Sequence, residues 1–279
     1  MDAPGDRIEL LQAESERLKQ YLTTLPPDAW HQPSACDRWQ VRDVVAHLAG
    51  TAEFYMAVIS GGLQGDASPP EALRAAGTAS ASSFHDMNAQ MAISYRERLG
   101  TEVLATFTAT NDKLNQLLTG LGPNDWNTPC YHPIGGTIPV RTFVELRLRE
   151  LAIHGWDIRS RFELAPQLSR DSLPVLMQDI ARLVSRSFRA GSRLPVPVRY
   201  RFELTGAGSV RTVIVVEGDQ VHVENAGETA THVTLGCDTE TFVLLMYGRI
   251  VFDSAVSEGQ ISVEGDREQA AQFGQWFGA

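Results

Sequence analysis

Two side chains of the kind that hold metal ions or protons lie four positions apart in the middle of the chain. Glu150 and His154 belong to the stretch RLRELAIHGWD. In an α-helix this spacing places both side chains on one face, where a carboxylate and an imidazole can bind one metal ion or share a proton. The helix is largely apolar around them, with Leu146, Leu151 and Ile153. A buried carboxylate and histidine need partners that offset lost hydration, so the pair indicates a functional site, although the spacing alone also describes a solvated helix pair.

A third candidate ligand lies about a hundred residues earlier. His47 is flanked by apolar residues in the stretch VVAHLA. If its helix packs beside the helix of Glu150 and His154, the three residues form a site of two histidines and one carboxylate. Three protein ligands leave positions open for water or substrate, as catalytic metals require, and the cores of helical bundles commonly hold such sites. The alternative is that His47 is a core histidine bonded to a backbone carbonyl.

The first 190 residues have the apolar periodicity of helices. Apolar residues recur every three or four positions from Ile8 to Leu25, and Pro26 and Pro27 end this first helix. Two loops rich in glycine, serine, asparagine or proline are expected at 61–82 and 122–139. Further helices are expected at about 41–60, 83–98, 101–120, 139–162 and 171–190.

After Pro195 the period changes to that of strands. Alternation of apolar and polar residues predicts strands, and Gly218–Asp219 is a two-residue hairpin signal. The chain is therefore predicted to contain two domains, a helical bundle with the metal site at 1–192 and an α+β domain at 193–279, with a linker at 190–197. The expected strands are 198–204, 210–216, 221–223, 232–236 and 260–264, with a helix near 239–247.

Composition and charge exclude several classes of function. There are 34 acidic against 24 basic residues, a formal net charge of −10 and no long basic run, so neither nucleic acid nor an anionic membrane is an expected partner. Three distant cysteines form no disulfide framework and fit a reducing compartment. No secretory signal, membrane span, or motif of metalloproteases, nucleotide-binding proteins or serine esterases is found. The prediction is a cytoplasmic enzyme that acts on a small molecule.

Two segments resemble the signatures of a known family. The stretch CDRWQVRDVVAHLA, residues 36–49, is similar to the first signature of the mycothiol-dependent maleylpyruvate isomerase family in the DinB-like superfamily, and ELAIHGWDI, residues 150–158, resembles the second. Near the C-terminus, LLMYGR and VEGD resemble landmarks of the family's sterol-carrier-like domain. The resemblance covers nearly the whole chain. It implies an α+β fold class, with a DinB-like four-helix bundle followed by a small sterol-carrier-like α/β sandwich.

The resemblance also implies the chemistry of the site. His47, Glu150 and His154 are then the ligands of a divalent metal, with zinc expected, and mycothiol is the thiol co-substrate. A metal lowers the pKa of a coordinated thiol, and the thiolate is the nucleophile. The favoured function is a mycothiol-using S-transferase acting on an electrophilic carbon, because extra length between Gly61 and Gly100 favours a substrate larger than a small diacid. The close alternative is cis–trans isomerisation of maleylpyruvate.

Arg249 is the fourth predicted catalytic residue. By resemblance, its guanidinium could reach a cleft between the domains and hold a substrate carboxylate through two hydrogen bonds. The alternative is that Arg249 caps the end of a helix.

Some neighbouring residues allow two interpretations. Asp43 and Asp157 lie one turn from candidate ligands, and each either orients a histidine or complements a helix terminus. Cys36 is interpreted as a buried inert thiol and Trp39 as a core residue. Gln40 is a weaker N-cap than serine or threonine.

Two other classes of function stay open from the sequence. Sterol-carrier-like domains can enclose apolar ligands, so the protein could bind such a ligand and retain only a vestigial metal site. Two histidines and one carboxylate also suit Fe(II), which would make the protein a non-haem iron oxygenase.

Overall fold

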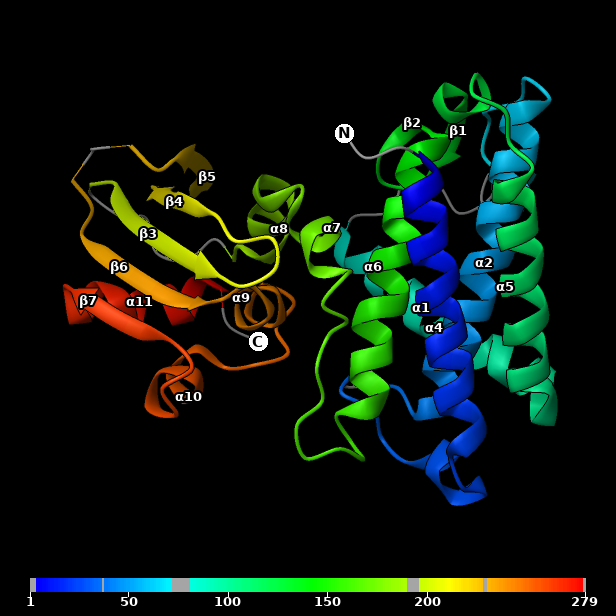
Figure 1. Ribbon diagram of the computed structural model, residues 1–279, viewed down its shortest axis with the longest axis horizontal. Helices are drawn as coiled ribbons and strands as arrows, with labels where there is room; N and C mark the ends of the chain where they lie inside the picture. Colours follow the sequence, from blue (N-terminus) through cyan, green and yellow to red (C-terminus); the bar gives the residue numbers. More distant parts are fainter. Residues whose placement is uncertain (1–3, 37, 72–80, 190–195, 228–229, 278–279) are drawn as a thin grey trace. The chain divides into compact units, whose positions relative to one another are not determined.

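The computed structural model describes residues 4–36, 38–71, 81–189, 196–227 and 230–277. The chain forms two compact units, Met1–Pro166 and Gln167–Ala279. The first is made of long helices and the second of a sheet with short helices (Figure 1).

The N-terminal unit is a helical bundle with a short β-hairpin. Its helices are α1 (Pro4–Thr24), α2 (Val41–Leu63), α4 (Ala81–Leu99), α5 (Val103–Thr119) and α6 (Val140–Arg159), and its antiparallel strands are β1 (Pro129–His132) and β2 (Gly136–Pro139). Short 3₁₀ helices lie at Pro27–His31, Gly100–Glu102 and Asp125–Asn127. α2 contacts α4, α5 and α6, while α1 contacts α5 and α6. This arrangement places α2 and α6 next to each other in the core.

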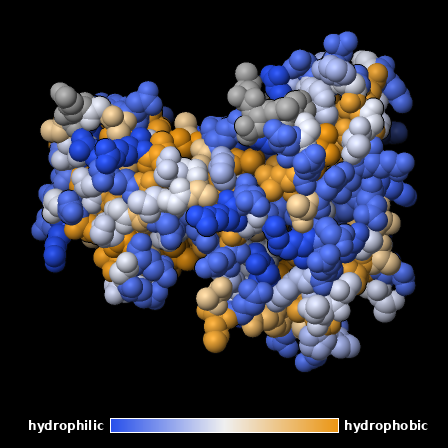
Figure 2. Space-filling view, in the orientation of Figure 1, coloured by the Kyte–Doolittle hydropathy of each residue, from blue (hydrophilic) through white to orange (hydrophobic). Residues whose placement is uncertain are grey.

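α2 is the most apolar helix of the bundle. By length and composition alone it could cross a membrane, a test that core helices of soluble proteins also pass. Val44, Val45, Leu48 and Ile59 are fully buried, and the helix packs against three others of the same unit. On the face shown in Figure 2 the helical unit presents mostly hydrophilic residues. Burial in the bundle core therefore accounts for the apolar composition of α2.

α2 continues past the glycines that the sequence indicates as its end. A Cβ atom on Gly62 would lie 2.5 Å from Cys130 Sγ and 2.7 Å from the carbonyl oxygen of Pro129. The glycine therefore allows the β1–β2 hairpin to pack closely on α2. This hairpin lies in the expected loop 122–139, because strands of four residues are too short for a period of two to be recognised. Part of the other expected loop, residues 72–80, lies outside the described residues.

The C-terminal unit is a mixed sheet with the strand order β5-β4-β3-β6-β7. β3 pairs antiparallel with β4 and parallel with β6. Val198, Tyr200, Phe202 and Leu204 of β3 are buried, as the alternating sequence predicts, and Gly218, with a φ of 62°, forms the expected turn between β4 and β5. The strands are β3 (Val198–Thr205), β4 (Arg211–Glu217), β5 (Gln220–Asn225), β6 (Val233–Asp238) and β7 (Ser262–Gly265).

Short helices pack on this sheet. They are α7 (Leu173–Met177), α8 (Ile180–Ser187), α9 (Thr239–Met246), α10 (Phe252–Ser257) and α11 (Arg267–Phe277). α9 contacts β3 and β6, and α11 contacts β6 and β7. Phe273 of α11 packs against the rings of Tyr200 and Phe202, with centroid distances of 5.0 and 5.3 Å. α10 and α11 are additions to the elements expected from the sequence.

The boundary between the units lies earlier than the predicted 192/193. The expected helix 171–190 is divided into α7 and α8, which contact α9 and β5 of the C-terminal unit. Asp179 separates them, because its φ of −121° and ψ of 63° are not helical and its Oδ1 accepts a hydrogen bond from Arg182 N at 3.1 Å. This bond caps the start of α8. The expected linker falls mostly on residues 190–195, outside the described residues.

Candidate active site

The neighbouring helices α2 and α6 carry the three predicted metal ligands. His47 lies in the second turn of α2, while Glu150 and His154 lie one turn apart on α6. The side chain of His47 is 6% exposed, and those of Glu150 and His154 are partly buried. The packing of α2 on α6 brings together residues that are 103 positions apart in the chain.

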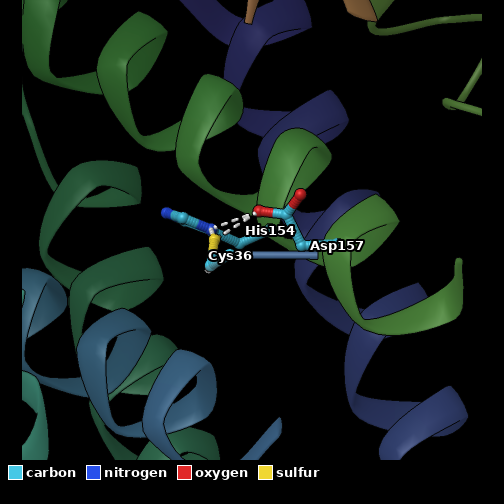
Figure 3. Close-up of side chains that lie close together, drawn as sticks. All are labelled: Cys36, His154 and Asp157. Atoms are coloured by element: carbon cyan, nitrogen blue, oxygen red, sulfur yellow. Dashed lines mark hydrogen bonds and ion pairs between the residues drawn. The ribbon is translucent and has the colours of Figure 1, made fainter. Parts of the chain in front are cut away.

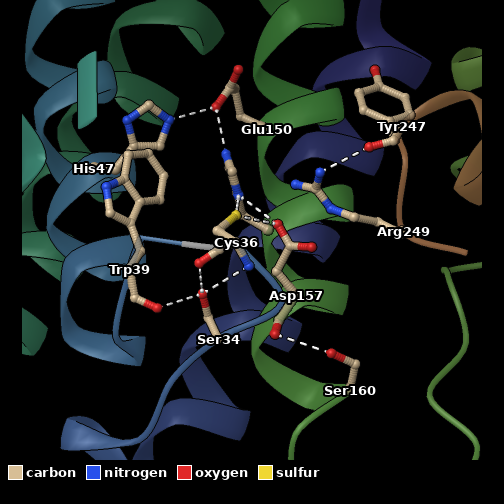
Figure 4. A network of polar contacts seen from close by, with 10 residues as sticks. Ser34, Cys36, Trp39, His47, Glu150, Asp157, Ser160, Tyr247 and Arg249 are labelled. Atoms are coloured by element: carbon tan, nitrogen blue, oxygen red, sulfur yellow. Dashed lines mark hydrogen bonds and ion pairs between the residues drawn. The ribbon is translucent and has the colours of Figure 1, made fainter. Parts of the chain in front are cut away.

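The donor atoms of these residues converge. Glu150 Oε2 lies 2.8 Å from His47 Nε2 and 3.3 Å from His154 Nε2. One ligand atom from each of the three residues lies within 4.8 Å of the other two, and both imidazoles turn toward the same carboxylate (Figure 4). Two imidazole nitrogens and one carboxylate oxygen form a donor set that could hold a divalent metal.

A buried carboxylate holds the other nitrogen of His154. Asp157 is fully buried, and its Oδ2 lies 2.9 Å from His154 Nδ1 and accepts a hydrogen bond from Cys36 Sγ at 2.9 Å (Figure 3). A proton on Nδ1 donated to Asp157 leaves the lone pair of Nε2 on the side of Glu150. Of the two roles predicted for Asp157, orientation of the histidine is the one that these contacts support. Cys36, His154 and Asp157 also form a second group whose atoms could hold a metal.

The turn before α2 brings Cys36 to the site. Ser34 Oγ accepts a hydrogen bond from Cys36 N at 3.0 Å and donates one to the carbonyl oxygen of Trp39 at 2.9 Å. Ala35 N donates to the carbonyl oxygen of Asp157 at 3.0 Å, which fastens the turn to α6. Cys36 is therefore half-buried and in contact with a carboxylate and an imidazole, which corrects the interpretation of an inert buried thiol. Its partners come from residues more than a hundred positions away.

Trp39 covers the imidazoles. Its ring centroid lies 4.8 Å from that of His47 and 5.7 Å from that of His154, and its indole N–H donates to the carbonyl oxygen of Ala89 on α4 at 3.4 Å. The side chain is half-buried. Trp39 is thus a wall of the candidate site, whereas the sequence indicates a core residue.

Asp43 serves the start of α2. Its Oδ2 accepts a hydrogen bond from Gln40 N at 2.9 Å, and its Oδ1 accepts one from Arg96 Nε at 2.8 Å. The helix-terminus role predicted for Asp43 is therefore confirmed. These bonds also support the N-terminus that begins with Gln40.

Burial and mutual contacts shift the pKa values of the three candidate ligands. Burial raises the pKa of Glu150, but hydrogen bonds with His154 and His47 outweigh it and hold the pKa well below its ordinary value. Burial lowers the pKa of His154, but its contacts with Asp157, Cys36 and Glu150 raise it well above the ordinary value. Burial dominates at His47 and lowers its pKa. The site therefore keeps a carboxylate charge at neutral pH and a proton on His154 that a metal ion would displace.

Arg249 follows α9 in the C-terminal unit. Its backbone N–H donates to the carbonyl oxygen of Leu244 at 2.8 Å, and the preceding Gly248 has a φ of 66°, as in a Schellman helix end. Arg249 Nη1 donates to the carbonyl oxygen of Tyr247 at 2.8 Å (Figure 4). These contacts are those of the capping role, and the catalytic role of Arg249 stays a prediction.

Arg147 is a residue of the site region that the sequence patterns did not reveal. It is 1% exposed on α6, where Nη1 donates to Thr51 Oγ1 at 2.7 Å and Nη2 donates to Asn111 Oδ1 at 2.8 Å. Burial lowers its pKa to about 10. An arginine three residues before Glu150, within an apolar helix, is the signal that points to it.

Comparisons with known proteins agree with this architecture. The family model of the mycothiol maleylpyruvate isomerase N-terminal domain matches residues 11–159, and that of the SCP-2 sterol transfer family matches residues 195–278. No curated protein matches the chain in sequence.

Two solved structures share the fold over nearly the whole chain. A crystal structure of the mycothiol-dependent maleylpyruvate isomerase has 15% sequence identity and a TM-score of 0.64, covering 94% of this chain and 93% of that one. A histidine-to-alanine mutant of that isomerase has 14% identity, with the same coverage and TM-score. The predicted fold class is confirmed.

The match to the N-terminal domain model extends over more than half of the chain and includes all three candidate ligands. It confirms the expectation of an enzyme, and it agrees with both signatures recognised in the sequence. The chain belongs to the mycothiol maleylpyruvate isomerase N-terminal domain family.

Proposed function

We propose that the protein is a metal-dependent enzyme that uses mycothiol as a nucleophile at an electrophilic carbon of a small molecule, and that the outcome is S-transfer. The observation that carries the proposal is the convergence of His47 Nε2, Glu150 Oε2 and His154 Nε2. Family membership supports mycothiol as the thiol. The predicted site residues His47, Glu150 and His154 are proposed as metal ligands on this basis.

The donor chemistry fits a divalent metal. Glu150 Oε2 lies within 3.3 Å of both imidazole nitrogens, so the donor atoms are gathered between two packed helices. Two imidazoles and one carboxylate are a ligand set of catalytic zinc sites, and zinc is the metal that we propose. When bound, it would lower the pKa of a thiol so that the thiolate is present at neutral pH.

The residues around the donor atoms orient and shield them. Asp157 fixes the orientation of His154 by holding Nδ1. Trp39 covers both imidazole rings on one side, which limits the access of water. In S-transfer, the thiolate sulfur forms a bond with the electrophilic carbon, and the leaving group departs with the electron pair of its broken bond.

Isomerisation is the second candidate function. The whole-chain likeness to the fold of the mycothiol-dependent maleylpyruvate isomerase favours it. In this reaction the thiolate adds to a conjugated double bond, the resulting single bond rotates, and the thiolate leaves again without net transfer. The sequence argument for S-transfer rests on a segment that includes residues 72–80, outside the described residues, so the two outcomes are separated by experiment.

Metal analysis tests the centre itself. The purified protein should carry one divalent metal per chain, and His47→Ala and His154→Ala should both lose it. His222→Ala is the matched control, because His222 Nε2 also lies near a glutamate oxygen, 3.2 Å from Glu224 Oε1, but on the exposed strand β5. Full metal content in both ligand variants would refute the centre.

Turnover assays test the chemistry. Activity should require mycothiol and should stop with a chelator, and equal turnover without any thiol would refute the nucleophile. Conversion of maleylpyruvate with recovery of free mycothiol would establish isomerisation, whereas a stable mycothiol adduct would establish S-transfer. Uptake of oxygen by an iron-loaded protein would instead favour the oxygenase. An apolar ligand bound to a metal-free protein would favour the binding function.

A further inference from the structure

Arg147 and Thr51 join α6 to α2 one helical turn away from the candidate metal ligands. Thr51 follows His47 by four residues on α2, and Arg147 precedes Glu150 by three residues on α6. The contact between His47 and Glu150 and the contact between Thr51 and Arg147 therefore lie in succession along the same two helices.

The Thr51–Arg147 contact reaches the backbone of a ligand directly. Arg147 Nη1 donates to Thr51 Oγ1 at 2.7 Å, and Thr51 Oγ1 lies 3.0 Å from the carbonyl oxygen of His47, to which it donates. The guanidinium is also held from a third helix, because Asn111 Oδ1 on α5 accepts from Nη2 at 2.8 Å. Asn111 is itself fixed, since its Nδ2 donates to the carbonyl oxygen of Phe107 at 2.8 Å. The position of Arg147 is thus set by both neighbouring helices.

Stability alone does not explain an arginine in this position. The side chain is 1% exposed, both of its hydrogen-bonded partners are neutral, and its Nε has no hydrogen-bond partner. Burial of a charge without an adjacent counter-charge is unfavourable, and an apolar side chain of similar volume is often as good or better for stability.

We propose that Arg147 is a positioning residue of the candidate metal centre. By holding Thr51, it fixes the separation and register of α2 against α6, and so it sets where His47 Nε2 lies relative to Glu150 and His154. Metal ligands must be placed within a few tenths of an ångström, and that accuracy depends on the residues that support them. This inference rests on the proposed function.

A purely electrostatic role makes the opposite prediction. If Arg147 acted only as a positive charge near the centre, its removal would strengthen the binding of a metal cation. If Arg147 positions α2, its removal weakens metal binding, and so does removal of the Thr51 hydroxyl, which changes no charge.

The test uses Thr51→Val, Arg147→Met and a matched control, Thr110→Val. Thr110 is buried on α5, and its Oγ1 lies 2.9 and 3.1 Å from the carbonyl oxygens four and three residues earlier. Thr51 makes the same pattern of backbone contacts, but only Thr51 also accepts a hydrogen bond from Arg147. The two threonine variants therefore differ chiefly in that contact.

Binding of Co²⁺ is the readout, through its dissociation constant and the visible spectrum of the bound ion, which reports ligand geometry. We expect Thr51→Val and Arg147→Met to weaken binding about 10-fold or more and to alter the spectrum, while Thr110→Val matches the wild type. Melting temperatures are measured in parallel, because a merely structural role would lower them without changing the spectrum.

The outcomes separate this inference from the proposed function. Wild-type affinity and spectrum in Thr51→Val, or tighter binding in Arg147→Met, would overturn the positioning role while leaving the metal centre intact. If Arg147→Met does not fold, Thr51→Val decides the question alone. Failure of the wild-type protein to bind Co²⁺ would refute the metal centre, and the positioning role with it.

Discussion

Asp157 is the residue through which the candidate site can be weakened without a change in any proposed ligand. Its Oδ2 lies 2.9 Å from His154 Nδ1 and 2.9 Å from Cys36 Sγ, and the side chain is fully buried. Asp157→Asn keeps the shape of the side chain and one oxygen, but it removes the charge that strengthens both contacts. Hydrogen bonds to charged groups contribute roughly 1.5–3 kcal/mol each, so the loss should lower the melting temperature of the helical unit.

The effect on metal binding follows from the same contact. Residues that hold the second nitrogen of a metal-binding histidine typically contribute about 10- to 100-fold to affinity. We therefore expect Asp157→Asn to raise the dissociation constant for Co²⁺ by about that factor. An affinity equal to that of the wild type would refute the argument that Asp157 orients His154.

The pH dependence of the metal-free protein provides a second measurement. The pKa of His154 is well above its ordinary value, chiefly through Asp157 acting against burial. A raised folded-state pKa stabilises the protein fully below the unfolded-state pKa of about 6.5, and this stabilisation is lost as pH rises through the folded-state pKa. Asp157→Asn should therefore lower the melting temperature more at about pH 6 than at about pH 9. A loss independent of pH would contradict the assignment.

Asp43→Asn is the matched control for these measurements. Asp43 is 3% exposed in the same unit, and its carboxylate bonds Gln40 N and Arg96 Nε at the start of α2. The substitution should lower the melting temperature through the lost helix cap and ion pair. It should leave the affinity for Co²⁺ unchanged, and an equal loss of affinity in both variants would show that general loosening of the bundle explains the effect.

The cysteines and Arg249 provide two further predictions. At about pH 8 an alkylating reagent should modify half-buried Cys36 well before Cys237, because burial protects Cys237 and raises its pKa to about 12. Mass spectrometry of the native protein gives the order, and equal rates would contradict it. Arg249→Ala should lower kcat/KM about 10- to 100-fold with metal content unchanged. Full activity with a lower melting temperature would instead assign Arg249 to the helix-end contact with Tyr247.

The candidate ligands could be predicted because their pattern is mostly local. Spacing alone places Glu150 and His154 on one face of a helix, and the apolar surroundings of His47, with the family resemblance, identify its helix as a partner. No periodicity shows that both Nε2 atoms approach one oxygen of Glu150. That approach depends on how α2 and α6 pack, which joins residues 103 positions apart.

Cys36 and Arg147 escaped prediction for different physical reasons. The environment of Cys36 is made by His154 and Asp157, which are more than a hundred positions away, so its sequence neighbours suggest an inert thiol. Arg147 stands in the sequence as one arginine among several near Glu150. Only the packed bundle shows that it is buried between Thr51 and Asn111.

The fold was predictable where patterns are long and regular. The eight residues of β3 alternate clearly, and the expected strand is present. α7 and α8 follow one continuous apolar pattern, but the non-helical backbone of Asp179 divides them, and a boundary of that kind is set by tertiary contacts. In α11 the buried residues Ala270, Phe273 and Phe277 have helical spacing, so its signal was present in the sequence.

The supports of the candidate ligands explain why the metal and thiol could be inferred more readily than the electrophile. His154 is held by Asp157 from its own helix, and the backbone of His47 is held through Thr51, so both supports belong to regular helices. The walls of the site come from irregular segments, since Trp39 lies in the turn before α2 and touches both imidazoles. Helical spacing constrains the metal ligands, whereas turn residues can change without disturbing the bundle. Substrate choice in this protein is therefore expected to depend on the turn that carries Cys36 and Trp39, where the sequence carries no periodic signal.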